Sequence, residues 1–125
     1  MIFNSPEVVA EVRDAFDRYE TALLANDVAT LDAFFLHRDD VVRYGVGELQ
    51  YGIAEIRAFR AIQRPFERTL DRLEIVAFGA DVAVASTLFY RSDFPASVGR
   101  QQQTWVRTPE GWRIGAAHVS MMPAP

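Results

Sequence analysis

The chain has 125 residues, half of them apolar, which is the size of one ordinary domain with enough apolar side chains to build a core. Its 17 acidic residues outnumber its 13 basic ones, so the composition provides neither the basic surface that nucleic acid requires nor a polybasic patch for a membrane. The chain contains no cysteine and no lysine, which excludes disulfides, thiolate metal sites, a cysteine nucleophile and Schiff-base chemistry on a lysine side chain.

We therefore expect a single domain over residues 1–125, with neither nucleic acid nor a membrane as a partner. The N-terminal residues have no signal-peptide pattern, and no apolar run approaches the ~20 residues of a membrane span. A cytoplasmic location is the resulting expectation.

Two helices are predicted at the start of the chain. Ser5-Pro6-Glu7 is typical of a helix N-terminus, because it supplies a capping hydroxyl, a proline at the first position and an acidic residue near the positive end of the helix dipole. Apolar residues then recur every three or four positions as far as Leu23, which predicts an amphipathic helix that ends near Asn26. Asp27 can cap a second, shorter helix over residues 28–35.

Residues from 41 onward are typical of strands, with one more helix among them. Two short strands, 41–44 and 49–51, are predicted to pair through Gly45 and Gly47. Gly52 then begins a third helix that Pro65 should end or bend. After residue 70, four segments rich in β-branched and aromatic residues predict strands joined in antiparallel order; they are 73–79, 82–91, 99–107 and 111–120.

Arg43 stands inside an otherwise apolar predicted strand. Burying a guanidinium without an anionic partner costs several kcal/mol. A structural interpretation supplies that partner from Asp39, Asp40 or Glu48, or leaves the side chain at an open edge. In the functional interpretation the strand lines a pocket, and the planar fork of donors holds the carboxylate of a small acid. Both interpretations stay open at this point.

The order of helix, helix, hairpin, helix and four-stranded meander is that of an α+β fold, in which a curved sheet can wrap around the helices and leave a conical cavity open at one end. This order resembles the NTF2-like (SnoaL-like) fold, a cone with three N-terminal helices packed in a curved, mainly antiparallel sheet. Local motifs resemble the AtzH-like and HpxZ-like family over nearly the whole chain. They are RYE (18–20), VRYG (42–45), YGIAEIRAFRA (51–61), GRQQQTW (99–105) and GWRIGAAHVS (111–120).

The resemblance implies a role in bacterial pathways that degrade ureide-like compounds. One branch of the family is a decarboxylating amidohydrolase that acts on 1,3-dicarboxyurea during cyanuric acid catabolism, and the other is linked to oxalurate; the motifs do not separate the two. The resemblance also implies that Tyr19 and Arg43 are the catalytic residues. No cofactor is implied, and a small anionic substrate is the expected partner.

Tyr19 has a structural alternative of its own, because a buried phenol normally finds a hydrogen-bond partner such as a backbone carbonyl. If it lies beside the cation Arg43, its hydroxyl can instead act as a general acid or base. For substrate binding we predict Gln103, whose amide can line the cavity, and His118, which shares strand parity with Trp112 and Ile114. A structural role for His118 is equally compatible with the pattern.

Other candidate sites are weaker. Two histidines without carboxylates at ligand spacing predict no metal site. Four arginines spaced three or four apart are interpreted as a solvated helix face, with attraction of an anion at a cavity mouth as the alternative; they are Arg57, Arg60, Arg64 and Arg68.

Two functions follow from this reasoning: a cofactor-independent amidohydrolase, or a non-catalytic protein that binds an anion in the oxalurate pathway. A homodimer is expected with either function. The reason is that Val82, Val84 and Leu88 alternate on the face of the sheet that the helices do not cover.

Overall fold

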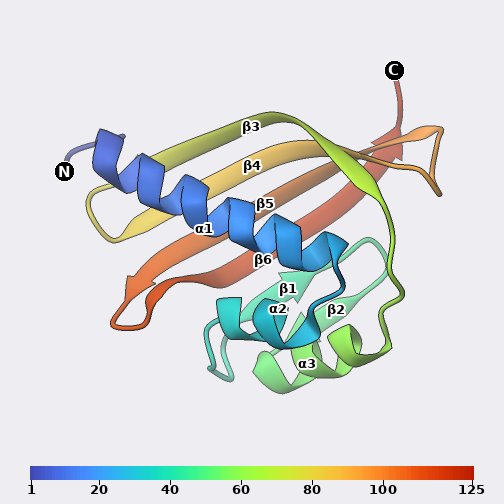
Figure 1. Cartoon of the computed structure of the whole chain (residues 1–125), viewed down its shortest axis with the longest axis horizontal. Helices are drawn as coiled ribbons and strands as arrows, with labels where there is room; N and C mark the ends of the chain where they lie inside the picture. Colours follow the sequence, from blue (N-terminus) through green and yellow to red (C-terminus); the bar gives the residue numbers. More distant parts are fainter.

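The computed structural model describes residues 1–125 and has the predicted α+β order (Figure 1). The helices are α1 (Pro6–Leu24), α2 (Val28–Phe34) and α3 (Ile53–Ile62), and the strands are β1 (Val42–Tyr44), β2 (Leu49–Tyr51), β3 (Arg68–Phe78), β4 (Val82–Arg91), β5 (Ser97–Thr108) and β6 (Gly111–Pro123). The predicted elements are therefore all present. Strand β4 has the predicted bounds, whereas β3 begins earlier, β6 ends later and β5 extends further at both ends than predicted.

The helix ends follow from local chemistry. Pro6 occupies the first turn of α1, where its missing N–H costs nothing, and the chain leaves α1 through Asn26, which adopts a left-handed φ of 53°. The carboxylate of Asp27 caps α2 by accepting a hydrogen bond of 3.3 Å from the backbone N–H of Thr30. The third helix, α3, ends at Ile62 and does not continue past Pro65.

All six strands form one sheet in the order β2-β1-β6-β5-β4-β3. Every pairing is antiparallel except that of β1 with β6, which is parallel. In Figure 1 the four long strands curve behind α1, and the β1–β2 hairpin lies with α2 and α3 at one end of the molecule. The concave face of the sheet and the inner face of α1 share one apolar core, and this core closes only part of the space between them.

A β-bulge in β6 decides which side chains face the helices. Trp105 pairs with Ile114 but Thr104 pairs with Ala116, so Gly115 is an extra residue in β6. The side-chain alternation reverses across this residue. Ile114 is buried on the concave face, whereas His118 is exposed on the convex face. The prediction that His118 shares the facing of Trp112 and Ile114 is therefore wrong, because it assumed an unbroken strand.

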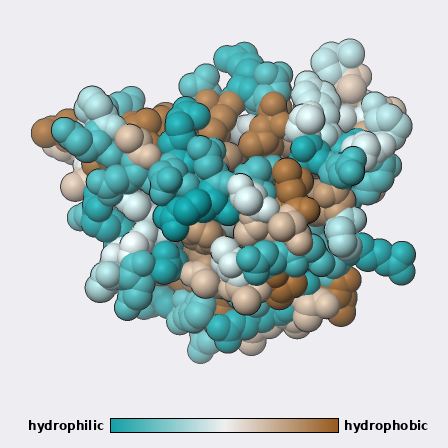
Figure 2. Space-filling model, viewed as in Figure 1, coloured by the Kyte–Doolittle hydropathy of each residue, from teal (hydrophilic) through white to brown (hydrophobic).

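The surface on the helix side is mainly hydrophilic, with apolar side chains in several separate places, one of them at the N-terminal end (Figure 2). Met1, Ile2 and Phe3 are exposed there, and Phe3 forms a bridge with Phe78 at the edge of the sheet. No helix combines the length and the apolar composition that crossing a membrane requires.

Candidate anion-binding site

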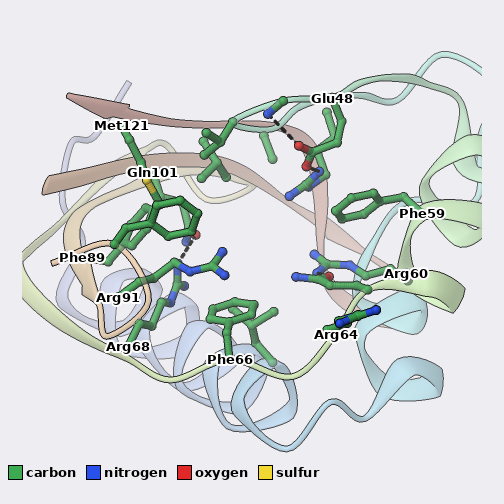
Figure 3. Close-up of a pocket in the computed structure, with 18 of the residues that line it drawn as sticks. Glu48, Phe59, Arg60, Arg64, Phe66, Arg68, Phe89, Arg91, Gln101 and Met121 are labelled. Carbon is green, nitrogen blue, oxygen red and sulfur yellow. Dashed lines mark hydrogen bonds and ion pairs between the residues drawn. The ribbon is translucent and has the colours of Figure 1, made fainter. Parts of the chain in front are cut away.

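A cavity of about 440 Å³ lies between α1, the β1–β2 hairpin, α3 and the concave side of β4, β5 and β6 (Figure 3). It is bounded at its mouth by the segment that follows α3 and by the β4–β5 turn. Tyr19, Arg43 and Gln103 all line this cavity, so the structure brings together three of the four predicted site residues.

Tyr19 projects from the inner face of α1 and is 3% exposed. Its ring makes edge-to-face contacts with Phe34, Phe35 and Trp105. Its hydroxyl accepts a hydrogen bond from Nη2 of Arg60. The hydroxyl partner of this buried tyrosine is thus a cation in the cavity, and the backbone carbonyl of the structural alternative is not used.

Arg43 lies in the middle of β1 and is 6% exposed. Its Nη1 donates to Oε1 of Gln50 at 2.8 Å and to Oε1 of Glu48 at 3.2 Å, and its guanidinium lies 4.8 Å from the centre of the Phe59 ring. Burial lowers the pKa of Arg43, and the nearby charge of Arg60 lowers it further. The structural interpretation is confirmed by the pair with Glu48, and the strand lines a cavity as the functional interpretation expects, while the binding of a carboxylate by Arg43 stays a prediction.

Three of the four arginines interpreted as a solvated face line the cavity instead: Arg60, Arg64 and Arg68. The interpretation was wrong because α3 ends at Ile62, so that Arg64 lies in the connection and Arg68 begins β3. Only Arg57 stays on the exposed side of α3. Arg91 of β4 joins the group, and Figure 3 shows Arg68 and Arg91 facing Arg60 and Arg64 across the hollow.

The cavity has more positive than negative charge. Arg43 pairs with Glu48 at 3.2 Å, Arg68 pairs with Glu20 at 2.6 Å, and Arg91 pairs with Asp93 at 2.7 Å. Arg60 and Arg64 have no carboxylate within ion-pair distance. Two buried donors, Nε of Arg60 and Nε2 of Gln101, have no acceptor. A ligand that supplies negative charge and acceptor oxygens would satisfy them.

Gln103 uses its Oε1 to accept a hydrogen bond of 3.2 Å from Nε1 of Trp105, so its amide nitrogen is the atom that can bind a ligand. His118 is outside the cavity. Its ring packs edge-to-face on the ring of Tyr44 on the convex face, with ring centres 6.1 Å apart. Arg43, the residue before Tyr44 in β1, faces the opposite side of the sheet and lines the cavity. The prediction that His118 lines this cavity is thereby corrected.

The sequence contains a signal for Arg60 that the interpretation as a solvated face overlooked. Arg60 follows Ile56 by four positions and Ile53 by seven, which places it on the apolar side of α3. The alternation of Gln101 and Gln103 predicts that one of these amides lines the cavity, and both of them do. Arg91 has no comparable signal. No group of three or more His, Asp or Glu side chains is arranged to hold a metal ion.

A curved sheet wrapped over three helices, with a cavity at its open end, defines a protein of the NTF2-like fold. An NTF2-like superfamily protein from Salmonella enterica has the same fold, with a TM-score of 0.78, 23% identity and coverage of 96% of this chain and 94% of that one. The chain belongs to the AtzH-like family, whose model matches residues 1–125.

Two solved structures are much more similar. A protein of unknown function of the DUF3225 family from Pectobacterium atrosepticum is 53% identical, with a TM-score of 0.93 and coverage of 96% of this chain and 94% of that one. A cystatin-like fold protein from Burkholderia xenovorans is 43% identical, with a TM-score of 0.96 and coverage of 100% and 99%. No curated protein matches the chain.

Proposed function

We propose that this protein is a cofactor-independent, decarboxylating amidohydrolase that acts on a small carboxylated urea resembling 1,3-dicarboxyurea, in the cytoplasmic catabolism of cyanuric acid. The observation that carries the proposal is the contact between the Tyr19 hydroxyl and the Arg60 guanidinium in a cavity that Arg43 also lines. A proton-transfer group and buried cations thus meet where a planar acid can bind. Membership of the AtzH-like family supports the choice of substrate class.

The reaction assigns one task to each residue. Arg43 fixes a carboxylate of the urea and polarises the adjacent carbonyl, while water adds to that carbonyl carbon. Tyr19 transfers a proton to the nitrogen that leaves as the C–N bond breaks, or takes one from the attacking water. With 1,3-dicarboxyurea, the nitrogen that takes up the proton leaves as carbamate, and the other product is an N-carboxycarbamate. Each carbamate group then takes up a proton and loses carbon dioxide unaided, which leaves ammonia.

A second candidate is a non-catalytic, anion-binding protein of oxalurate catabolism. The observation that favours it concerns Glu48, the one carboxylate that lines the cavity, which is already hydrogen-bonded to other groups of the protein. Glu48 accepts hydrogen bonds from Arg43 at 3.2 Å and from the backbone N–H of Gly47 at 2.6 Å. A carboxylate held in this way is poorly placed to serve as a general base for water.

Ammonia release separates the two candidates. Purified protein is incubated with 1,3-dicarboxyurea, allophanate and oxalurate, and binding of each compound is measured in parallel by calorimetry. We expect ammonia from at least one carboxylated urea, in amounts proportional to protein and absent with Tyr19→Phe. Binding of these compounds without ammonia release would reject the hydrolase and leave the accessory function.

A further inference from the structure

We propose that Arg60 is a second binding residue beside Arg43, and that it offers a carboxylate of the ligand a positive charge that no contacting carboxylate of the protein matches. This inference rests on the proposed function only for the ligand class, a small planar carboxylate. Arg60 is 2% exposed, and it lines the cavity beside Tyr19.

All direct partners of Arg60 are neutral. Its Nη2 donates to the Tyr19 hydroxyl, its Nη1 donates to Oε1 of Gln63 at 2.6 Å, and its buried Nε has no acceptor. The carboxyl of Asp32 in α2 is close enough for the charge of Arg60 to act on its pKa. Burial raises the pKa of Asp32, and the charges of Arg57 and Arg60 oppose that rise, but Asp32 forms no ion pair with Arg60. The charge of Arg60 is therefore not matched by a contacting carboxylate.

The other cavity arginines differ from Arg60 in this respect. Arg43, Arg68 and Arg91 each have a carboxylate within 3.2 Å. Arg64 has none, but it is exposed at the mouth, where water can solvate it. Arg60 alone combines burial with the lack of an anion. Because a buried charge is costly without a counter-ion, the structure leaves the place of that counter-ion to a ligand.

The position of Arg60 also suits the chemistry. A carboxylate bound to Arg60 would lie next to the Tyr19 hydroxyl, since the two side chains are already hydrogen-bonded. It would also offset the repulsion that Arg60 exerts on Arg43, which is one cause of the lowered pKa of Arg43. One anion would thus relieve two buried cations and bring its neighbouring carbonyl to the proton-transfer group.

This role predicts opposite effects on stability and binding. A residue that serves the fold should lower the melting temperature when it is replaced. An unmatched buried charge that serves a ligand should leave the melting temperature unchanged or raise it when a neutral side chain takes its place. Arg60→Met removes the charge and keeps much of the apolar stem. Arg60→Gln also removes the charge and keeps a polar group toward Tyr19.

The test measures binding of oxalurate and of its neutral carboxamide by calorimetry, together with melting temperatures. We expect both neutral variants to bind oxalurate about 10-fold to 100-fold more weakly than the wild type and to bind the carboxamide with unchanged affinity. The reason is that only the carboxylate of oxalurate forms a hydrogen bond between two charged groups with Arg60, and the variants cannot form that bond. Arg57→Met, on the exposed side of the same helix, is the matched control and should bind like the wild type.

Three results would overturn the proposal. They are oxalurate affinity within about 3-fold of wild type in either folded neutral variant, a large fall in melting temperature in both of them, or no binding of oxalurate by the wild type. Turnover is not part of the readout. A wild-type protein that binds oxalurate through Arg60 but hydrolyses none of the ureas would reject the proposed function and keep this inference.

Discussion

At the scale of single residues, Tyr19 combines an apolar environment for its ring with a charged partner for its hydroxyl. Its ring is enclosed by aromatic side chains, while its hydroxyl meets a guanidinium. The ring environment fixes where the hydroxyl lies, and the guanidinium of Arg60 donates a hydrogen bond to its oxygen. Such an arrangement holds a proton donor or acceptor in one place before a ligand arrives.

We expect Tyr19→Phe to lower the turnover number by roughly 10²-fold to 10⁴-fold with little change in substrate binding, because only a hydroxyl is removed. The loss of stability should stay near 1 kcal/mol. Assays of ammonia release measure the turnover number, and thermal unfolding of the same preparation measures the stability. Tyr44→Phe is the matched control, since the hydroxyls of Tyr44 and Tyr51 form a hydrogen bond of 3.0 Å with each other outside the cavity. A fully active Tyr19→Phe protein would remove Tyr19 from the mechanism.

Arg43→Lys keeps the positive charge at this position and removes the planar guanidinium with its two parallel hydrogen-bond donors. A lysine can still pair with Glu48, so the fold should survive, but it cannot fix a carboxylate with two parallel hydrogen bonds. We expect kcat/KM to fall by about 10²-fold or more. Arg38→Lys, which alters an exposed pair with Asp40, should have no effect on kcat/KM. Near-normal activity in Arg43→Lys would show that charge alone suffices at this position.

At the scale of elements, the sequence predicted which segments form helices and strands, because periodicity and turn residues act locally. It failed where one residue changes the geometry of an element. Gly115 reverses the alternation in β6 and so sends His118 to the outer face. Pro65 ends the helical spacing, so Arg68 takes its direction from β3 and not from α3. Tyr19 and Arg43 were identified as catalytic candidates through the resemblance to the AtzH-like family, and the regular spacing of its helix predicted only that Tyr19 is buried.

One acidic residue ties three elements together. Glu11 of α1 accepts hydrogen bonds from Nε1 of Trp112 in β6 at 2.9 Å and from Arg107 in β5 at 2.7 Å. The bond from Trp112 and the bond from Arg107 lower the pKa of Glu11 below its ordinary value. A carboxyl whose pKa is lower in the folded state stabilises the fold above its unfolded-state pKa, and this contribution is lost as pH falls through the folded-state pKa.

Glu11→Gln should therefore be less stable than the wild type at pH 7, and the difference should shrink as pH falls from about 5 to 3. Urea unfolding at a series of pH values measures this difference. Asp14→Asn on the same helix, which alters an exposed ion pair with Arg18, should follow the wild-type curve closely. A difference that is the same at every pH would mean that the charge of Glu11 does not stabilise the fold.

At the scale of the whole molecule, charge is separated between the surface and the interior. The net charge is −4, yet the cavity has an excess of arginine. The overall charge offers no long-range attraction for an anion, so recognition depends on the cations inside and at the mouth. Under the proposed function, selectivity for an anion would therefore depend on the cavity and not on the outer surface.

The convex face of the sheet leads to the last prediction, because the helices cover only the other face. Val82, Val84 and Leu88 point outward from β4, and their neighbours Val76 and Phe78 on β3 are 38% and 36% exposed. We propose that a second copy of the chain covers this face, since apolar strands seldom stay open to water.

Light scattering should then give about twice the 14.1 kDa of the chain. Val84→Glu should yield the monomer, because it would place unmatched carboxylates in the interface. Leu24→Glu, on the helix side, should leave the dimer intact, whereas a 14.1 kDa particle for the wild type at micromolar concentration would contradict the proposal.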